Sequence, residues 1–303
     1  MTHTRTDASE RVAESPGLFD ALRLRFPELS AGQRQVAEFL LAHSADAAFL
    51  SAAAIGARVG VSESTVVRLA SRAGYHGYPE LQQRLRNELK ERLSPQARMA
   101  STLRAVDAAS VYQRAFGQDL ANIVRARDGL SGDRLQEVVE RLRKARINYA
   151  IGMRSSLAVA HLYVFFVNQV LRNARLLDGA ADQIGDQLAG ISPRDTLLAV
   201  GFPRYSRRSR EVLRFAKRRG AFVVVVTDSP VSPLGLEGDV VLPAPCDALG
   251  FPISIVAAVS VVNALVAGLA FTEGKRALRR LAELDRANRE LRVMLAKMEE
   301  PDG

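Results

Sequence analysis

The fold of this chain is decided by residues 195–230, which read DTLLAVGFPRYSRRSREVLRFAKRRGAFVVVVTDSP. A short apolar run at 196–201 is followed by a charged helical stretch that begins near Ser206, and then by AFVVVVT at 221–227. Four consecutive valines are typical of a central strand that is covered on both faces. The segment therefore predicts a strand–helix–strand unit with parallel strands.

The same alternation of strands and helices continues in both directions along the chain. The further strand candidates are INYAI (147–151), ARLLD (174–178) and DVVLP (239–243). The other helical stretches of this part begin near Ser155, Asp182 and Phe251. Two more helical stretches, 108–127 and 133–145, precede the first strand. We therefore expect residues 108–275 to form a doubly wound α/β domain around a largely parallel sheet.

The first third of the chain has a different character. Residues 18–92 are rich in Ala, Leu and Arg and lack β-rich runs, which predicts an all-helical domain. Residues 93–107 contain Pro95 and little periodic pattern, so we place the linker there. Residues 1–17 are expected to be a disordered tail. Residues 276–303 are expected to form a charged helix and tail, which would either pack across subunits or be solvated.

Composition narrows the class of protein. The 303 residues carry 42 Lys and Arg against 33 Asp and Glu, and this net charge of +9 favours an anionic partner. Cys246 is the single cysteine, which excludes an internal disulfide framework and fits the cytoplasm. The N-terminal residues contain no secretory signal. The uncharged stretches 155–171 and 251–271 carry internal polar groups, and the chain has no Trp. We therefore expect buried core helices and no membrane partner.

Residues 51–74, SAAAIGARVGVSESTVVRLASRAG, predict two helices joined by a tight turn. Ser51 can cap the first helix, Gly60 permits the turn, and Ser62 can cap the second helix. The second helix offers short polar groups at its N-terminal end and an arginine one turn later, which suits the major groove of DNA. The candidate DNA-contacting residues are Ser51, Ser62, Glu63, Ser64, Thr65, Arg68 and Arg72.

The roles of these residues stay open at this point. Arg68 can reach a guanine edge or a phosphate, and Glu63 can accept from a base amino group or face solvent. The alternative is a helical hairpin whose serines only cap. Residues 51–92 carry seven basic and four acidic side chains, and this surplus of +3 would bind DNA weakly as a monomer. We therefore expect a homodimer or homotetramer on a palindromic operator of double-stranded DNA.

Two strand-to-helix loops carry residues that suit an anion. The first reads Gly152-Met153-Arg154-Ser155-Ser156 and the second reads Phe202-Pro203-Arg204-Tyr205-Ser206. Hydroxyl groups and free N–H groups at a helix start bind anions, and ligands of open α/β sheets bind at the carboxyl ends of strands. The candidate effector-binding residues are Gly152, Arg154, Ser155, Ser156, Arg204, Tyr205, Ser206 and Ser254, the last of which could equally cap a helix.

The second loop opens a strongly basic helix. Residues 203–220 hold eight basic side chains and one acidic residue, Glu211. We expect the distal members simply to solvate a surface helix. These are Arg210, Arg214, Lys217, Arg218 and Arg219.

The N-terminal part resembles the DNA-binding domain of the MurR/RpiR family of bacterial transcriptional regulators. The resemblance rests on the VSxxTVxR core, on the closing signature GYHGYPEL at 74–81, and on the preceding helix at 29–42. Residues 108–275 resemble the sugar isomerase (SIS) domain that these regulators carry, with TDSPVSPL at 227–234 as the most specific phrase. The resemblance implies a helix-turn-helix regulator of a metabolic operon that is controlled by a carbohydrate-derived effector.

The two loops depart from the SxSGxT and GxGxS patterns of that family, because Arg154 and Arg204 stand at small flexible positions. We expect an anion that is recognised partly by guanidinium groups. A phosphosugar, a sugar acid, another carboxylate or another phosphorylated metabolite would each fit.

The alternative function is a SIS-fold sugar-phosphate isomerase, which would need a general base. His161 falls on the apolar face of a helix, where a core histidine is the commoner case, and Glu211 and Glu273 are isolated. Neither loop has the GxGxxG spacing of a dinucleotide site. We therefore expect no catalytic residue, no metal and no cofactor.

Overall fold

A computed structural model describes residues 18–92, 94–178 and 183–293. The chain divides into two compact units between Glu91 and Arg92, next to the boundary that we expected. The predicted tail at 1–17, the end of the predicted C-terminal segment and the predicted helix start at Asp182 lie outside the described residues. Each unit is described by itself.

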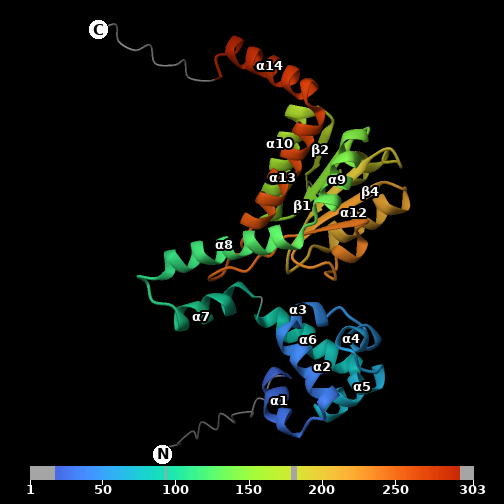
Figure 1. The fold of residues 1–303 in the computed structure, drawn as a ribbon, viewed down its shortest axis with the longest axis vertical. Helices are drawn as coiled ribbons and strands as arrows, with labels where there is room; N and C mark the ends of the chain where they lie inside the picture. Colours follow the sequence, from blue (N-terminus) through green and yellow to red (C-terminus); the bar gives the residue numbers. More distant parts are fainter. Residues whose placement is uncertain (1–17, 93, 179–182, 294–303) are drawn as a thin grey trace, which may run out of the picture. The chain divides into compact units, whose positions relative to one another are not determined.

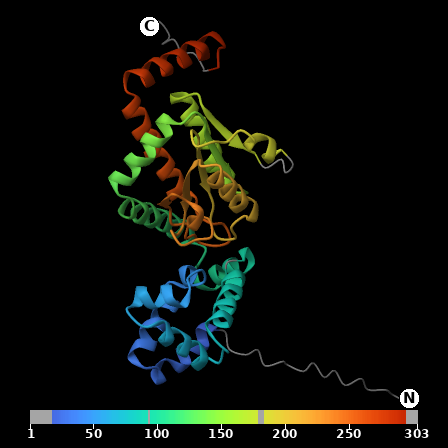
Figure 2. The same cartoon turned by 90° about the vertical axis from the view of Figure 1, so that its right-hand side faces the viewer.

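The first unit is helical, as its sequence predicts (Figure 2). Its elements are α1 (Leu18–Arg25), the 3-10 turn η1 (Phe26–Glu28), α2 (Ala31–Ala42), α3 (Ser44–Ala47), α4 (Ala52–Val59), α5 (Glu63–Arg72) and α6 (Tyr78–Arg92). Helix α2 begins with a capping box in which the Ser30 hydroxyl accepts from the Gln33 N–H and the Gln33 side chain accepts from the Ser30 N–H. The core joins Leu40 of α2 and Ile55 of α4 to Leu69 of α5.

The second unit is built on a five-stranded sheet in which every neighbouring pair of strands is parallel (Figure 1). The strands are β1 (Asn148–Gly152), β2 (Ala174–Leu177), β3 (Thr196–Val200), β4 (Phe222–Thr227) and β5 (Val240–Pro243). All five predicted strands are therefore confirmed. Their order is β2-β1-β3-β4-β5, so the direction of winding reverses between β1 and β3.

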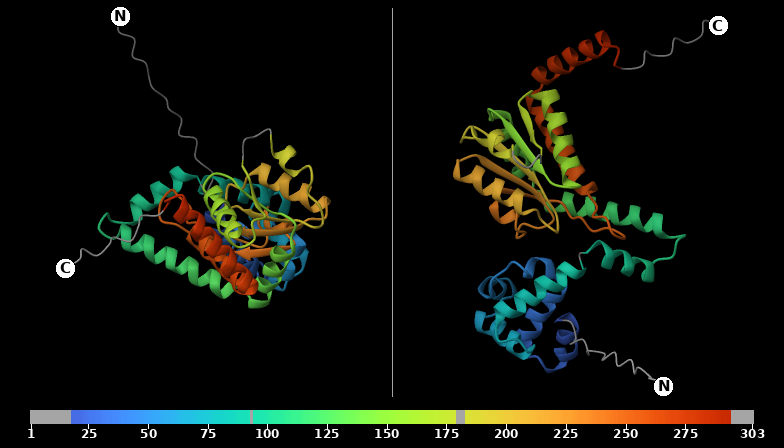
Figure 3. Two further views of the ribbon diagram at one scale, coloured as in Figure 1. Left: turned by 90° about the horizontal axis from the view of Figure 1, so that it is seen from above. Right: turned by 180° about the vertical axis from the view of Figure 1, so that it is seen from behind.

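Helices cover both faces of this sheet (Figure 3). They are α9 (Gly132–Lys144), α10 (Ser156–Val170), α11 (Ile184–Leu188), α12 (Arg207–Arg218) and α13 (Val256–Glu273). Helix α8 (Val111–Gly129) packs on α13. Alternate residues of each strand point to opposite faces. Val224 and Val226 of β4 pack with α9, α10 and α13, whereas Val223 and Val225 pack with α11 and α12. The doubly wound architecture is confirmed.

Helix α13 is long and apolar enough to cross a membrane by composition alone. In this structure it packs against α8, α9, α10 and α14 (Lys275–Glu290), and six of its residues are buried. It begins at Val256, later than the predicted start near Phe251. The intervening residues 251–255 form an irregular loop instead.

Residues 95–105, within the stretch that we expected to be a linker of little regular structure, form a helix, α7 (Pro95–Ala105). The Ser94 hydroxyl accepts from the Ala97 N–H, and Pro95 occupies the first turn, where its missing N–H costs nothing. This helix belongs to the second unit. The Thr102 hydroxyl accepts from the Gly250 N–H at 2.9 Å, and the Arg98 guanidinium donates to the carbonyl oxygen of Phe251.

Candidate functional site

The helix pair α4 and α5 has the geometry that its sequence predicts. The Ser51 hydroxyl accepts from the Ala54 N–H at 3.1 Å and caps α4. Gly60 ends α4 in the left-handed region, at φ 79°, where a side chain would be strained. Val66 and Leu69 of α5 are buried in the core of the unit. The opposite face of α5 is therefore the one that a partner can reach.

The N-terminal end of α5 presents a cluster of hydroxyl groups. Ser62 stands at the N-cap position, but its hydroxyl does not cap the helix. It bonds instead to the hydroxyls of Ser64 and Thr65, both at 2.9 Å. The Arg68 Nη2 lies 3.5 Å from the Ser64 hydroxyl and 3.4 Å from the Thr65 hydroxyl. The exposed Glu63 lies on the same turn. The expectation that Ser62 caps α5 through its side chain is wrong, and its hydroxyl belongs to this outward-facing cluster.

Arg72, at the other end of α5, has internal partners. Its guanidinium donates to the carbonyl oxygen of Glu28, and its own carbonyl oxygen accepts from the Arg25 guanidinium. These bonds tie the end of α5 to the first helices of the unit. Arg72 is therefore placed to position α5, while Arg68 is placed to reach outward.

The two predicted loops of the second unit lie side by side at one edge of the sheet. Gly152 at the end of β1 is in register with Val200 at the end of β3, so the chain leaves both strands at the same level. This is the point where the strand order reverses, which is where open α/β sheets bind ligands. The sequence-based placement of the loops follows directly from the register.

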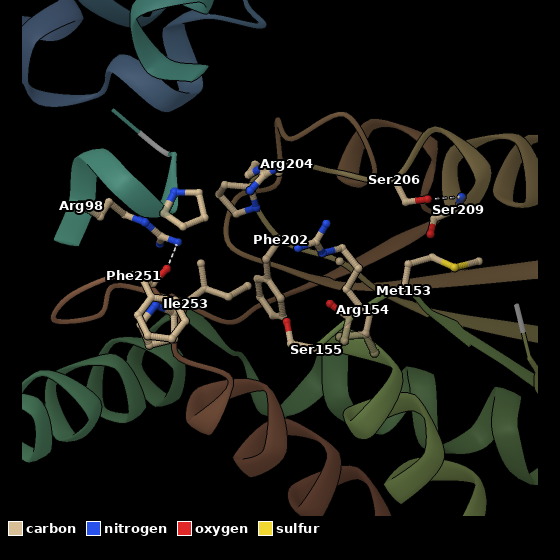
Figure 4. A pocket seen from close by; sticks show the side chains of 16 residues that line it. Arg98, Met153, Arg154, Ser155, Phe202, Arg204, Ser206, Ser209, Phe251 and Ile253 are labelled. Carbon is tan, nitrogen blue, oxygen red and sulfur yellow. Dashed lines mark hydrogen bonds between the residues drawn. The ribbon is translucent and has the colours of Figure 1, made fainter. Parts of the chain in front are cut away.

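A cavity of about 320 Å³ opens at this point (Figure 4). It is lined from the first loop by Met153, Arg154, Ser155 and Ser156, from the second by Val200, Gly201, Phe202, Pro203, Arg204, Ser206 and Ser209, from the loop before α13 by Phe251, Pro252 and Ile253, and from α7 by Pro95 and Arg98. The volume is at the lower end of the range for small-molecule sites.

Three of the predicted effector residues do not line the cavity. Gly152 lets the loop pack closely against the start of α10, because a Cβ at that position would come within 2.2 Å of the Ser156 carbonyl oxygen. The Tyr205 hydroxyl donates to the Asp228 carboxylate at 2.8 Å. The Ser254 hydroxyl donates to the Asp119 carboxylate at 2.5 Å. These side chains hold neighbouring segments together beside the cavity.

Arg154 and Arg204 adopt backbone conformations that normally belong to glycine. Their φ angles are 58° and 71°. Both residues lie in strand-to-helix loops and line the cavity. The left-handed region costs a residue with a side chain roughly 1–2 kcal/mol. Such strain is concentrated at functional sites because the surrounding structure has to enforce it. The two arginines that replace small residues in these loops are therefore strained and aimed at one cavity.

The charged side chains that line the cavity are all positive. Arg98, Arg154 and Arg204 surround it, and no Asp or Glu occurs among the described residues that line it (Figure 4). Burial lowers the pKa of Arg98, and the positive charge of Arg204 lowers it further. The hydroxyl of Ser206 accepts from the Ser209 N–H at 3.3 Å and caps α12, while Ser155 is exposed at the start of α10. The arrangement suits a small anion.

Sequence reasoning missed two groups of this cavity, Arg98 of α7 and the apolar residues of the loop before α13. Ser94-Pro95 is a helix-start signal that could have indicated α7. Nothing in the sequence indicates that Arg98 folds against a loop about 150 positions away, where it bonds to Phe251.

Three of the five distal basic residues are not simply solvated, which corrects our expectation for them, whereas Arg218 and Arg219 are exposed, as expected. Arg210 and Arg214 donate to the Glu237 carboxylate at 2.9 Å and 2.8 Å, and Lys217 pairs with Asp239 at 3.1 Å. Burial would raise the pKa of Glu237, but the bonds from the two arginines outweigh it and lower that pKa. Three basic residues of α12 thus have acidic partners within the unit.

His161 is exposed on α10, so its prediction as a core residue is wrong. It lines a shallow groove between α10 and α14 together with Phe165, Arg172, Arg280 and Leu284. This groove is separate from the cavity at the ends of β1 and β3.

Comparisons with protein families give two matches along the chain. Residues 17–92 match the helix-turn-helix domain of the rpiR family, and residues 141–268 match the SIS domain. Two bacterial regulators are similar over most of the chain. The HTH-type transcriptional regulator HexR of Pseudomonas aeruginosa is 27% identical over 85% of this chain and 90% of its own length. HexR of Escherichia coli is 23% identical over 91% of this chain and 95% of its own length.

Two solved structures are also similar to this chain. The sugar isomerase domain of an RpiR transcription factor from Sphaerobacter thermophilus is 30% identical, with a TM-score of 0.57, over 58% of this chain and 99% of that domain. The NanR protein of Vibrio vulnificus, solved in complex with ManNAc-6P, is 21% identical with a TM-score of 0.59, over 92% of this chain and all of that one. The latter likeness shows a shared fold.

The strain at Arg204 predicts an unusual order of stabilities. Glycine is free to adopt φ 71° and alanine is not, so Arg204→Gly should be more stable than Arg204→Ala by about 1 kcal/mol. The matched control is Glu211, which lies inside α12, where Gly should be less stable than Ala by about 1 kcal/mol. Urea unfolding of the four variants measures both differences. Equal stabilities of the two variants at position 204 would contradict the strain.

Proposed function

The chain belongs to the RpiR family of transcriptional regulators, and from that premise we propose that it controls a bacterial metabolic operon in response to a small anionic, carbohydrate-derived metabolite. The observation that carries the effector part is the cavity at the ends of β1 and β3, where strained arginines meet with no acidic partner among the described lining residues. The site of action is the bacterial cytoplasm, where operator DNA is found.

The DNA-reading element of this proposal is α5. Its buried face packs on α2 and α4, and its exposed face carries the hydroxyl cluster and Arg68. Hydroxyl groups at a helix start donate to phosphates, and a guanidinium one turn further reaches base edges in the major groove. Ser51 at the start of α4 lies at a second helix N-terminus that suits phosphate, while Arg72 holds α5 in position.

The effector part is supported by chemistry and by a relative. NanR of Vibrio vulnificus was solved with ManNAc-6P, a phosphorylated sugar derivative. In this chain, Arg154 and Arg204 offer guanidinium groups that suit phosphate or carboxylate, and Ser155 and Ser156 lie at the start of α10. A phosphosugar and a sugar acid both satisfy these groups. We expect one of the two to be the effector.

A sensing role fits this cavity better than isomerase chemistry. Isomerisation of a sugar needs a general base within reach of the substrate. The described residues that line the cavity include no carboxylate and no imidazole, and His161 lies in a different groove. We therefore propose a non-catalytic effector domain.

We further propose that the protein acts as a homodimer or homotetramer held together by its SIS units. Tyr112, Phe116 and Leu120 follow one another at intervals of four along α8, and each exposes more than 60% of its surface. Such an apolar stripe on a helix marks a contact surface. Two copies would double the number of phosphate contacts, which the small charge surplus of the DNA-reading part requires.

Arg68→Ala tests the reading helix. If Arg68 contacts a base, the loss of operator binding should be about 1–3 kcal/mol and should be confined to the operator sequence. Fluorescence anisotropy with DNA from upstream of the protein's own gene cluster, against a scrambled duplex, measures this loss. Arg58→Ala, which removes an exposed arginine of α4, is the control. An equal loss on both duplexes would make Arg68 a phosphate contact, and an unchanged affinity would reject α5 as the reading element.

Thermal-shift screening of phosphosugars and sugar acids tests the effector site. A ligand at about 100 times its Kd should stabilise the wild-type protein by about 2.7 kcal/mol. The shift should disappear in Arg204→Gly and persist in Arg218→Ala, which removes an exposed arginine at the far end of α12. A shift that survives in Arg204→Gly would reject this cavity as the site. Turnover of any hit would restore the isomerase interpretation.

Phe116→Asp tests the α8 stripe. A carboxylate in the middle of an apolar contact surface should convert the oligomer into a monomer and weaken operator binding at least tenfold, because a monomer neutralises fewer phosphates. Sedimentation velocity measures the mass. Gln113→Asp places the same charge at an exposed position beside the stripe and should leave the oligomer intact. An unchanged mass in Phe116→Asp would place the interface elsewhere.

A further inference from the structure

One face of helix α7 lines the cavity at the ends of β1 and β3. Pro95 and Arg98 line the cavity, and Thr102, one turn further along the same face, accepts from the Gly250 N–H. Among the residues that the structure describes, Arg98 to Phe251 and Thr102 to Gly250 are the hydrogen bonds that join α7 to the loop before α13. One of these bonds therefore lies at the cavity and the other lies beside it.

Arg98 has donor capacity that the protein leaves unused. Its Nη2 donates to the Phe251 carbonyl oxygen, but its Nε is buried without a hydrogen-bond partner among the described residues. A buried guanidinium N–H without an acceptor is unfavourable. An oxygen of a bound anion inside the cavity would satisfy the donor and the charge together. The side chain points toward the same space as Arg154 and Arg204 (Figure 4).

Helix α7 follows the DNA-reading unit directly in the sequence and connects it to the SIS unit. Helix α6 ends at Arg92 and belongs with the DNA-reading helices, and α7 starts at Pro95. Every change in how α7 is attached to the SIS unit is therefore a change in the tether that carries the DNA-reading unit.

We propose that Arg98 is a third anion-binding group of the effector site, and that an effector with at least two negative charges clamps α7 onto the SIS unit. The inference rests on the proposed function, because it takes the cavity as the effector site and the first unit as the DNA reader. Three guanidinium groups without a lining acid repel one another, and a dianion compensates them better than a monoanion. A phosphate monoester has this charge, and so does a molecule with one phosphate or carboxylate at each end.

The clamp explains how a small ligand would reach the DNA-reading unit. A ligand shifts a conformational equilibrium only through its differential affinity for the two states. A ligand bound to Arg154 and Arg204 alone has the same contacts whether α7 is attached or released. A ligand that also binds Arg98 favours the attached state, so its binding energy at Arg98 is the coupling between effector and tether.

Hydrogen–deuterium exchange of the full chain at about pH 8, where inorganic phosphate is mainly the dianion, tests the proposal, with acetate as the monoanion at equal ionic strength. Phosphate should slow exchange of residues 95–105 several-fold in the wild-type protein, and acetate should not. In Arg98→Ala, phosphate should bind about 10- to 100-fold more weakly and leave the exchange of α7 unchanged. Arg104→Ala removes an exposed arginine from the same helix and should behave as wild type. Arg98→Lys keeps the charge and should recover part of the affinity.

The outcomes separate this inference from the proposed function. If the wild-type protein shows neither phosphate binding nor protection of residues around the cavity, the proposed effector site fails. If phosphate protects the loops at Arg154 and Arg204 in wild type and in Arg98→Ala with equal affinity, the effector site stands and the clamp is rejected. Protection of α7 by acetate equal to that by phosphate would overturn the requirement for two charges.

Discussion

The left-handed backbone of Arg154 and Arg204 is the constraint around which the effector unit is arranged. Each residue follows a strand of the same sheet, and the register of β1 with β3 brings the two loops together at the reversal of strand order. A conformation that costs roughly 1–2 kcal/mol persists only where its surroundings enforce it. Here each of the two conformations lies between the end of a strand and the start of a helix. The result is a pair of guanidinium groups that approach one cavity from adjacent strand ends.

Most of the fold could be predicted because its signals are local. Four valines in β4, bounded by Gly220 and by Thr227-Asp228, indicate a buried strand without knowledge of any partner. The glycine and serines after β1 indicate a loop at a helix start in the same way. Once parallel strands are assumed, the two loops must share an edge of the sheet, and so five of the predicted effector residues line one cavity. Helix α7 escaped prediction because only a narrow face of it is covered, which leaves a weak periodic pattern.

What failed were inferences about the partners of individual side chains. The eight basic side chains of residues 203–220 suggested solvated charge. Glu237 and Asp239, from the segment between β4 and β5, nevertheless pair with three of them in the folded unit. The Ser62 side chain was expected to cap because of its position, but its hydroxyl prefers two neighbouring hydroxyls. Tyr205, a predicted effector-binding residue whose role stays a prediction, bonds to Asp228 through its hydroxyl, which its sequence position did not indicate. The sequence determines the position of a side chain on its helix or loop, whereas tertiary contacts determine which acceptor that side chain bonds to.

These corrections alter what the basic character of the chain means. The charge surplus of +9 is neither spread evenly nor concentrated on the DNA-reading helix, and three basic residues of α12 pair with acidic neighbours in the same unit. The guanidinium groups with no acidic partner among the described residues around the cavity are therefore few, and each has a large effect in a partly buried space. Arg98 is the member of this group that stands on the tether rather than on the sheet. If the strained pair of arginines sets the affinity for the anion, Arg98 sets how much of that affinity is converted into attachment of α7. Substitutions at Arg154 or Arg204 then change the affinity without changing this conversion, whereas a substitution of Arg98 changes both.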